Sequence, residues 1–252
     1  LLLRWGLSLP RARAPLPFAV PWTLVDVAEA VAVLLFALVV GGLISPGTPP
    51  HGAEAAEEGT MRAVLMGVQY VLVVGATIAL IIWRVRSRSS HPWRVLGMRF
   101  RGPARLVGVG IAGYAVFLTG ILAVGALLGS LFGGALALAQ TTEEIIGSAA
   151  STTEVVLYLI LVSVLAPLAE ETIFRGYVYG GLRRFLSAGQ AILLGGLVFA
   201  AVHLNADALL MITAIGALLC YLYERTRSLV PGIVAHALHN GLVLMIILLQ
   251  SM

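Results

Sequence analysis

The feature that most constrains this chain is a series of seven continuous apolar segments. Several of them approach or exceed the roughly 20 residues that a helix needs to cross about 30 Å of hydrocarbon. Apolar residues make up 60% of the 252 residues and only 11% are charged, a balance that soluble domains do not show. The segments are 24–44, 63–83, 106–128, 155–169 and beyond, 188–202, 206–223 and 229–249.

These segments do not alternate with a period of two residues, so they favour helices over the strands of a membrane barrel. We therefore expect an all-α fold, a polytopic transmembrane helix bundle of about seven to eight helices. The eighth would come from the glycine-rich stretch 131–139 or from the residues after Arg175. Cys220, the one cysteine in the sequence, excludes an intrachain disulfide, and its place in an apolar segment indicates a packing role.

The distribution of charge predicts the topology. All sixteen basic residues are arginines, and seven of them lie between Arg84 and Arg105. Such enrichment in a short loop marks the cytoplasmic side, which places the acidic stretches 51–59 and 140–144 outside. The residues before the first apolar segment lack a core long enough for a signal peptide and are expected to form a cytoplasmic lead-in.

The same charges indicate the partners. A basic loop beside membrane spans is suited to the anionic head groups of the lipid bilayer, and we interpret it so rather than as a nucleic-acid contact. The compact length and the all-arginine basic set point to a multi-pass protein of the bacterial plasma membrane.

The two halves of this integral membrane unit differ in kind. Residues 1–150 are expected to hold the N-terminal spans and the basic loop, with Asp26 and Glu29 in an interfacial, first-turn role. Residues 151–252 are expected to form a core with polar groups inside apolar segments. Each ionisable group at membrane depth costs at least about 2.5 to 3.5 kcal/mol, so several together imply mutual pairing or a polar cavity. The polar residues inside these apolar segments are Glu170, Glu171, Arg175, His203, Asn205, Asp207, His236, His239 and Asn240.

Two adjacent glutamates, Glu170 and Glu171, end a long stretch without charge. On a helix Glu171 and Arg175 are four residues apart with the acid first, the favourable order for an ion pair along one face. Glu170 projects about 100° away, so one carboxylate can be structural while its neighbour is free for chemistry. Pro167 removes a backbone hydrogen bond, which membrane helices tolerate where a bend opens onto a cavity.

Two further segments carry histidines. His203 lies near the end of one, and His236 lies one turn before Asn240 on a common face of the other. A carboxylate that takes a proton, a histidine that positions water, and a histidine with an amide that stabilise an oxyanion would together activate water. His203 is much farther from its flanking arginines than His236, so equal depth requires a tilted or broken helix.

Taken singly, these residues also fit plainer roles. Glu171 and Arg175 on one helix face are accounted for by an ion pair. A buried histidine is accounted for by a bond to a backbone carbonyl, which applies to His203 and His239. Asn205 and Asp207 lie in a short break between spans and are suited to a turn.

Three short patterns resemble the motifs of the type II CAAX prenyl endopeptidase and bacteriocin-processing family, the CPBP or Abi membrane proteases. They are EETIFR at 170–175, FAAVH at 199–203 and HALHN at 236–240, in that order and on separate apolar segments. Each is weak alone, and their combination is specific over about residues 154–245. The resemblance implies an all-helical intramembrane endopeptidase with its catalytic core in 151–252. It would cleave membrane-associated proteins or peptides, in CAAX prenyl-protein or bacteriocin-type processing, without a metal or other cofactor.

The resemblance also implies a role at each matched position. Glu170 would act with His203 as the general base on water, and His236 and Asn240 would form the oxyanion hole. The remaining matched positions, expected to hold Glu170 in place or to meet the substrate, are Glu171 and Arg175.

Two other functions stay open. A zinc-dependent intramembrane protease would use Glu170, His203 and His236 as ligands, although the chain has no HExxH pattern. A non-catalytic membrane immunity or scaffold protein would also hold charged groups in a bundle. A rhomboid-like serine protease and a transporter are disfavoured, because the sequence has no serine elbow and no inverted repeat.

Overall fold

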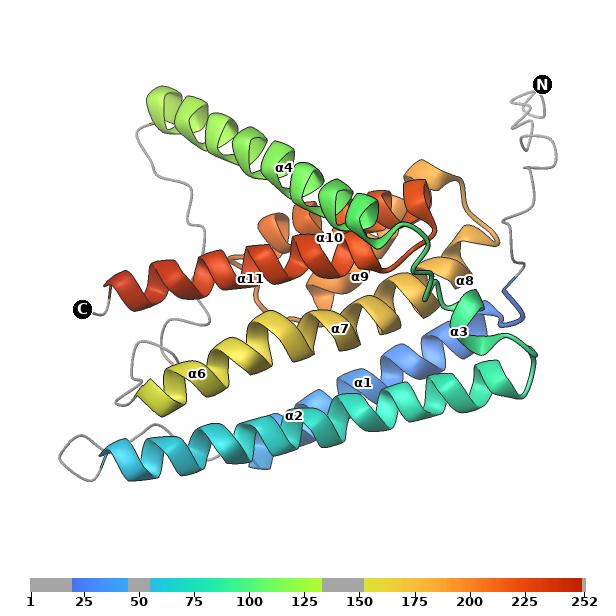
Figure 1. Cartoon of the computed structure of the whole chain (residues 1–252), viewed down its shortest axis with the longest axis horizontal. Helices are drawn as coiled ribbons and strands as arrows, with labels where there is room; N and C mark the ends of the chain where they lie inside the picture. The colour runs from blue at the N-terminus through green and yellow to red at the C-terminus, as the bar shows by residue number, and fades with distance from the viewer. Residues whose placement is uncertain (1–19, 45–54, 133–151, 251–252) are drawn as a thin grey trace, which may run out of the picture.

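A computed structural model describes residues 20–44, 55–132 and 152–250, and all regular structure within them is helical (Figure 1). The elements are α1 (Leu24–Ile44), α2 (Ala55–Arg86), α3 (Pro92–Val95), α4 (Pro103–Phe132), α6 (Thr152–Ile160), η1 (Leu161–Leu165), α7 (Ala166–Glu170), η2 (Glu171–Tyr179), α8 (Gly180–Arg183), α9 (Ala188–Ala201), α10 (Leu209–Thr226) and α11 (Val230–Gln250). The two η segments are π-helical. The predicted lead-in, the start of the acidic stretch 51–59, the acidic stretch 140–144 and residues 133–139 lie outside the described residues.

The seven apolar segments are all helical, which confirms the predicted all-α bundle. Within the described residues, six helices are long and apolar enough to cross a membrane, and α9 is a shorter apolar helix of 14 residues. The residues after Arg175 do not form a helix of their own, because α6, η1, α7, η2 and α8 join into one apolar helix of 32 residues, Thr152–Arg183.

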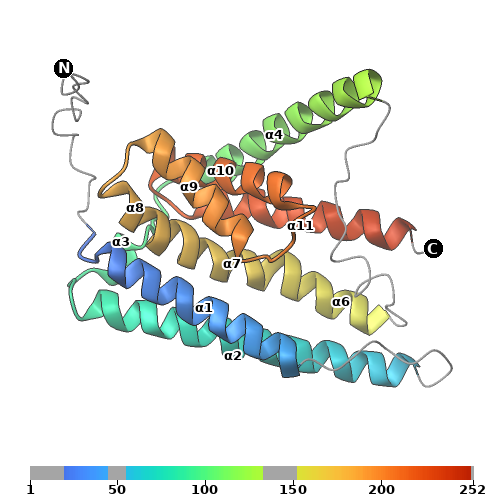
Figure 2. The same cartoon turned by 180° about the vertical axis from the view of Figure 1, so that it is seen from behind.

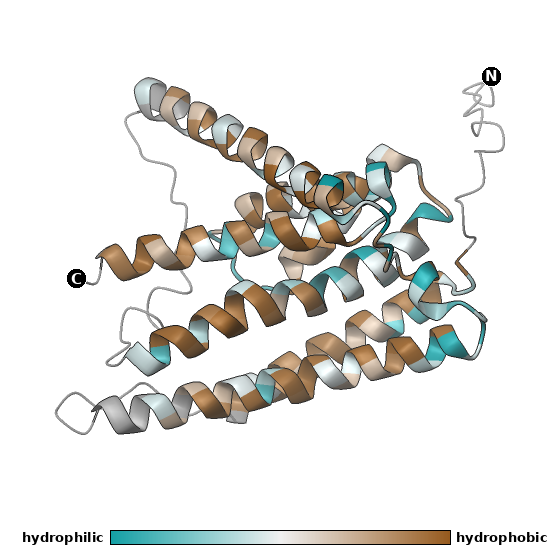
Figure 3. Cartoon of the chain, viewed as in Figure 1, coloured by the Kyte–Doolittle hydropathy of each residue, from teal (hydrophilic) through white to brown (hydrophobic). Residues whose placement is uncertain are grey.

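The two ends of the bundle differ in polarity. Figure 1 shows that α1 begins at the end where α3 lies, whereas α11 ends at the opposite end. Hydrophilic positions gather at the α3 end (Figure 3), which carries the arginines between Arg84 and Arg105. The positive-inside rule predicts that this end faces the cytoplasm.

This topology predicts the reactivity of introduced cysteines. A cysteine at Ser89 is expected to react with a membrane-impermeant maleimide only from the cytoplasmic side, and one at Ala56 only from outside, because α2 separates the two positions. The native Cys220 is 1% exposed and provides an unreactive internal control. Labelling of intact cells is compared with labelling of inverted vesicles. Reaction of both cysteines from the same side would contradict the order of crossings.

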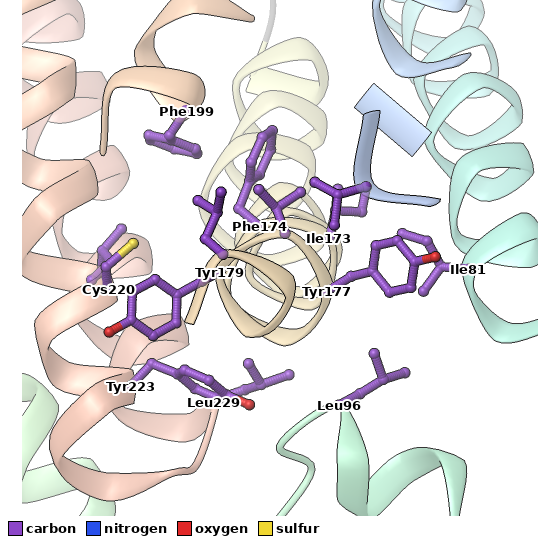
Figure 4. Close-up of a cluster of buried hydrophobic side chains, with 14 of the residues drawn as sticks. Ile81, Leu96, Ile173, Phe174, Tyr177, Tyr179, Phe199, Cys220, Tyr223 and Leu229 are labelled. Atoms are coloured by element: carbon purple, nitrogen blue, oxygen red, sulfur yellow. The ribbon is translucent and has the colours of Figure 1, made fainter. Parts of the chain in front are cut away.

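The helix η2 lies at the centre of the bundle. All nine of its residues are buried. Figure 4 shows its side chains pointing in several directions, with Phe174 edge-on to Phe199 and Tyr179 edge-on to Tyr223, at centroid distances of 5.0 and 5.9 Å. A helix that is surrounded by other helices can carry ionised groups without presenting them to lipid.

The helices α9 and α10 pack backbone against backbone. A Cβ atom on Gly196 would lie 2.7 Å from the carbonyl oxygen of Thr213, and one on Gly216 would lie 3.0 Å from the Cα of Gly196. Small residues permit such an approach in membrane bundles. Figure 2 shows the short α9 ending near the middle of the bundle, so the connection 202–208 lies at depth. The early end of α9 supplies the break that the spacing of His203 requires.

At the α3 end of the bundle, ion pairs close the α1–α2 hairpin and an aromatic contact fixes it to the core. Asp26 in the first turn of α1 forms ion pairs with Arg84 and Arg88 at 3.4 and 2.6 Å, and Glu29 pairs with Arg84 at 2.6 Å. The ring of Trp22 stacks on an aromatic ring of η2 at 4.6 Å. The first-turn position predicted for the acidic residues is confirmed for Asp26, whereas Glu29 lies one turn farther along α1. The stacking of Trp22 holds the hairpin against η2.

Candidate active site

The predicted ion pair between Glu171 and Arg175 is present and entirely buried. The Arg175 Nη1 and Glu171 Oε1 atoms are 2.8 Å apart, and both side chains are 0% exposed. Arg175 also donates from Nη2 to the carbonyl oxygen of Gly216 at 3.2 Å, and its guanidinium lies 4.3 Å from the centroid of the Phe199 ring. The ion pair lies within η2, whereas the hydrogen bond joins this helix to α10 and the cation–π contact joins it to α9.

Phe199 is the hub of an aromatic cluster. Its ring is edge-on to the ring of His203 at 4.7 Å and to that of His236 at 5.6 Å. The sequence identified Phe199 as a motif position without a role. The structure supplies one, since a single buried ring separates the two histidines and covers Arg175.

His236 lies between the two glutamates. Its Nδ1 donates to Glu171 Oε1 at 3.2 Å, because a carboxylate can only accept, and its Nε2 lies 3.8 Å from Glu170 Oε2. The adjacent carboxylates therefore do not diverge completely, and one imidazole contacts both. Glu171 is fully buried, whereas the side chain of Glu170 keeps 19% exposure.

Glu170 faces a cavity of about 230 Å³. His203 lines the same cavity, so the structure brings together the two residues expected to act on water. The Nδ1 of His203 donates to the carbonyl oxygen of Phe199 at 2.7 Å, which leaves Nε2 as the ring nitrogen available to another partner. The other lining residues are Leu34, Leu38, Tyr70, Val74, Ile173, Phe174 and Val202.

Four of these lining residues come from the first half of the chain, where no functional residue was predicted. Leu34 and Leu38 belong to α1, and Tyr70 and Val74 to α2. The hydroxyl of Tyr70 donates to Glu170 Oε1 at 3.3 Å. Tyr70 lies in an ordinary apolar segment, and no pattern in the sequence marks it.

Asn240 forms a hydrogen bond with the π-helical segment η1. The N–H of Ala166 bonds to the carbonyl of Leu161 in the π-helical pattern, and the next donor in that pattern would be residue 167, a proline. The carbonyl left over is that of Val162, and it accepts a hydrogen bond from Asn240 Nδ2 at 2.8 Å. Pro167 thus provides an acceptor that fixes the asparagine of the third motif, with one amide hydrogen of Asn240 still available.

The remaining polar residues do not line the cavity, and the partner of His239 is a side-chain hydroxyl instead of the predicted backbone carbonyl. His239 turns to α4, where its Nδ1 lies 3.4 Å from the hydroxyl of Tyr114. Asn205 accepts from the N–H of Ala208 at 3.1 Å in the turn before α10, and Asp207 lies in the same connection. Among the described residues, no group of three His, Cys, Asp or Glu side chains is arranged to hold a metal ion.

The fit of Glu171 against α11 predicts a loss of stability in Gly232→Ala. A Cβ at this position would collide with Glu171 Oε2, and the carboxylate cannot move away because Arg175 and His236 hold it. Overpacking of this kind costs about 1 to 3 kcal/mol, so the melting temperature in detergent should fall. The matched control is Gly241→Ala on the same helix, where the new Cβ would lie at an ordinary 3.6 Å from Ser163 Oγ. Equal melting temperatures for the two variants would refute the tight contact.

Comparisons with known proteins bear on the same region. Residues 152–242 match the family model of the type II CAAX prenyl endopeptidase Rce1-like proteins. The putative membrane peptidase YdiL of Bacillus subtilis is 34% identical over 87 residues, which span 34% of this chain and 36% of YdiL. The membrane-embedded CAAX protease MroQ of Staphylococcus aureus is 23% identical over 198 residues, which span 76% of each chain. No solved structure matches the chain.

The matched segment contains every predicted catalytic and supporting residue, from Glu170 to Asn240. Its motifs and its two bacterial relatives indicate the same kind of membrane peptidase, and its apolar helices indicate several membrane spans. The chain is therefore a multi-pass bacterial membrane protein, and its residues 152–242 are similar to the type II CAAX prenyl endopeptidase Rce1-like proteins, as the resemblance to the CPBP or Abi membrane proteases predicts.

Proposed function

We propose that this chain is an intramembrane endopeptidase that hydrolyses peptide bonds of membrane-associated proteins or peptides, in CAAX prenyl-protein or bacteriocin-type processing. The observation that carries the proposal is that Glu170 of α7 and His203 of the connection after α9 line one cavity. A carboxylate and an imidazole on one cavity can hold a water and remove its proton. The family match over 152–242 supports peptide hydrolysis as the reaction.

In the proposed reaction Glu170 takes a proton from a water that His203 orients through Nε2. The water oxygen attacks the carbonyl carbon of the substrate, and the carbonyl electron pair moves onto its oxygen. Glu170 then passes the proton to the amide nitrogen as the C–N bond breaks, which leaves a carboxyl group and an amine.

The oxyanion is assigned to His236 and Asn240. For His236 to donate from Nε2 while Nδ1 donates to Glu171, both ring nitrogens must carry hydrogen. The carboxylate of Glu171 would compensate the resulting charge. Asn240 would contribute the amide hydrogen that Val162 does not take. These contacts give Glu171 a supporting role through His236.

The proposal is tested by the peptides that the protein releases. Membranes from cells that express the wild-type chain are compared with membranes from cells that express Glu170→Gln, and new peptide N-termini are identified by mass spectrometry. We expect a set of N-termini that occurs only with the wild type, in membrane-associated proteins or peptides. Identical N-termini in both samples, with both proteins folded and equally abundant, would overturn the proposal.

Chelators should leave the wild-type rate unchanged within about twofold, because the proposed reaction uses carboxylate, imidazole and amide groups alone. The rate is measured with EDTA and with phenanthroline on a peptide that spans one of the mapped junctions. Loss of activity that zinc restores would make His236 a metal ligand and would replace the proposed reaction by zinc-dependent hydrolysis.

A further inference from the structure

One contact reaches Glu170 from outside the segment that matches the family. Tyr70 belongs to α2 and is separated from Glu170 by 100 residues, yet its hydroxyl is 3.3 Å from Glu170 Oε1. The tyrosine is half-buried, packs against the main core and lines the cavity beside the glutamate. Hydrogen bonds in catalytic sites are often this long before a substrate binds.

The two oxygens of the Glu170 carboxylate face different helices. Oε1 faces Tyr70 of α2, and Oε2 faces His236 of α11 at 3.8 Å. His203 approaches from the connection between α9 and α10 through the shared cavity. The α1 side of that cavity is formed by leucines. A free carboxylate rotates about its last bond, so a donor on Oε1 decides which oxygen lone pairs are presented to a water.

We propose that Tyr70 is a positioning residue for Glu170, and that its hydroxyl holds Oε1 so that the carboxylate faces the cavity that it shares with His203. This inference rests on the proposed function, in which Glu170 is the base. It assigns part of the site to α2, which the family match does not include. Tyr70 acts through Glu170 and touches no reacting atom itself.

The variant Tyr70→Phe removes the hydroxyl and keeps the ring. We expect kcat to fall about 10-fold, the size of one hydrogen bond to a charged group, with KM within about twofold and an unchanged melting temperature. In a Glu170→Gln background the same change should have no further effect, because the group that it positions is absent. The probe is a fluorogenic peptide that spans a junction mapped in the comparison of N-termini.

Tyr114→Phe is the matched control. It removes a hydroxyl that makes a similarly long contact, 3.4 Å to His239, on the side of the bundle that faces α4. We expect its kcat to stay within about twofold of the wild type. A 10-fold loss in Tyr114→Phe, or a wild-type kcat in Tyr70→Phe, would overturn the positioning role.

A second measurement does not depend on activity. The carboxylate stretching band of Glu170 is isolated as the infrared difference between the wild type and Glu170→Gln. We expect this band to shift in Tyr70→Phe and to keep its frequency in Tyr114→Phe, since Tyr70 donates to the carboxylate and Tyr114 contacts His239 instead. An unshifted band in Tyr70→Phe refutes the contact. A shifted band in a protein that cleaves no peptide refutes the proposed function and leaves the contact standing.

Discussion

Exchange of Glu170 for glutamine is expected to lower kcat for peptide hydrolysis by about 100-fold to 10,000-fold, the range that a general base contributes. Glutamine has nearly the same shape and can still accept from Tyr70, but its amide cannot take a proton from water. His236 keeps its contact with the Glu171 carboxylate at 3.2 Å, so we expect the melting temperature to change little. Steady-state kinetics on a mapped junction peptide and a melting curve in detergent measure the two effects separately.

The neighbouring carboxylate supplies the control. Glu171→Gln changes the same group one residue later, where it is fully buried between Arg175 and His236. We expect the melting temperature of this variant to fall. Its folded fraction should keep more activity than the folded fraction of Glu170→Gln. If the two variants lose folded protein equally and cleave equally well, the glutamates form a purely structural pair and the reaction has no base.

Arg175→Met is expected to destabilise the fold by about 3 to 5 kcal/mol, the largest effect on stability that we predict. Methionine fills much of the volume, but it leaves the Glu171 carboxylate without the ion pair at the centre of the bundle. A stranded buried charge has a cost of this size. The variant also loses the hydrogen bond to Gly216 and the contact with Phe199. Urea unfolding in micelles measures the change in free energy.

Two further variants identify the cause. Glu171→Gln combined with Arg175→Met removes both charges, and we expect it to recover most of the stability, since apolar replacement of a buried pair is often neutral. Glu29→Gln breaks the partly exposed pair with Arg84 and should cost less than about 1 kcal/mol. A double variant as unstable as Arg175→Met would show that the cost lies in lost packing instead of the stranded charge.

Much of the fold follows from local signals. The apolar segments are continuous over lengths that only membrane helices need, and the Glu171–Arg175 pair follows from a four-residue spacing along one helix. The three motifs lie in the second half, so their convergence could be predicted from their order and their apolar surroundings. Residue roles that depend on neighbours within one helix can therefore be predicted from the sequence.

Other parts depend on contacts between distant segments. Tyr70 becomes part of the site because the stacking of Trp22 on an aromatic ring of η2 holds the α1–α2 hairpin against that helix, and no local pattern encodes this approach. The hydrogen bond from Asn240 to Val162 depends on a π-helical turn before Pro167, whose register the sequence does not reveal. Which of the two glutamates is free for chemistry likewise depends on which one lines the cavity, and the structure places Glu170 there.

The shortness of α9 has a consequence for biosynthesis. At 14 residues and 1.5 Å per residue it is about 21 Å long, which is less than the roughly 30 Å of the hydrocarbon layer. Its far end leads into the connection 202–208, whose backbone groups cannot be left facing lipid. We therefore expect the insertion machinery to retain α9 until α10 has been translated. The two helices should then enter the bilayer together as a hairpin closed at Gly196 and Gly216, which carries His203 to its depth.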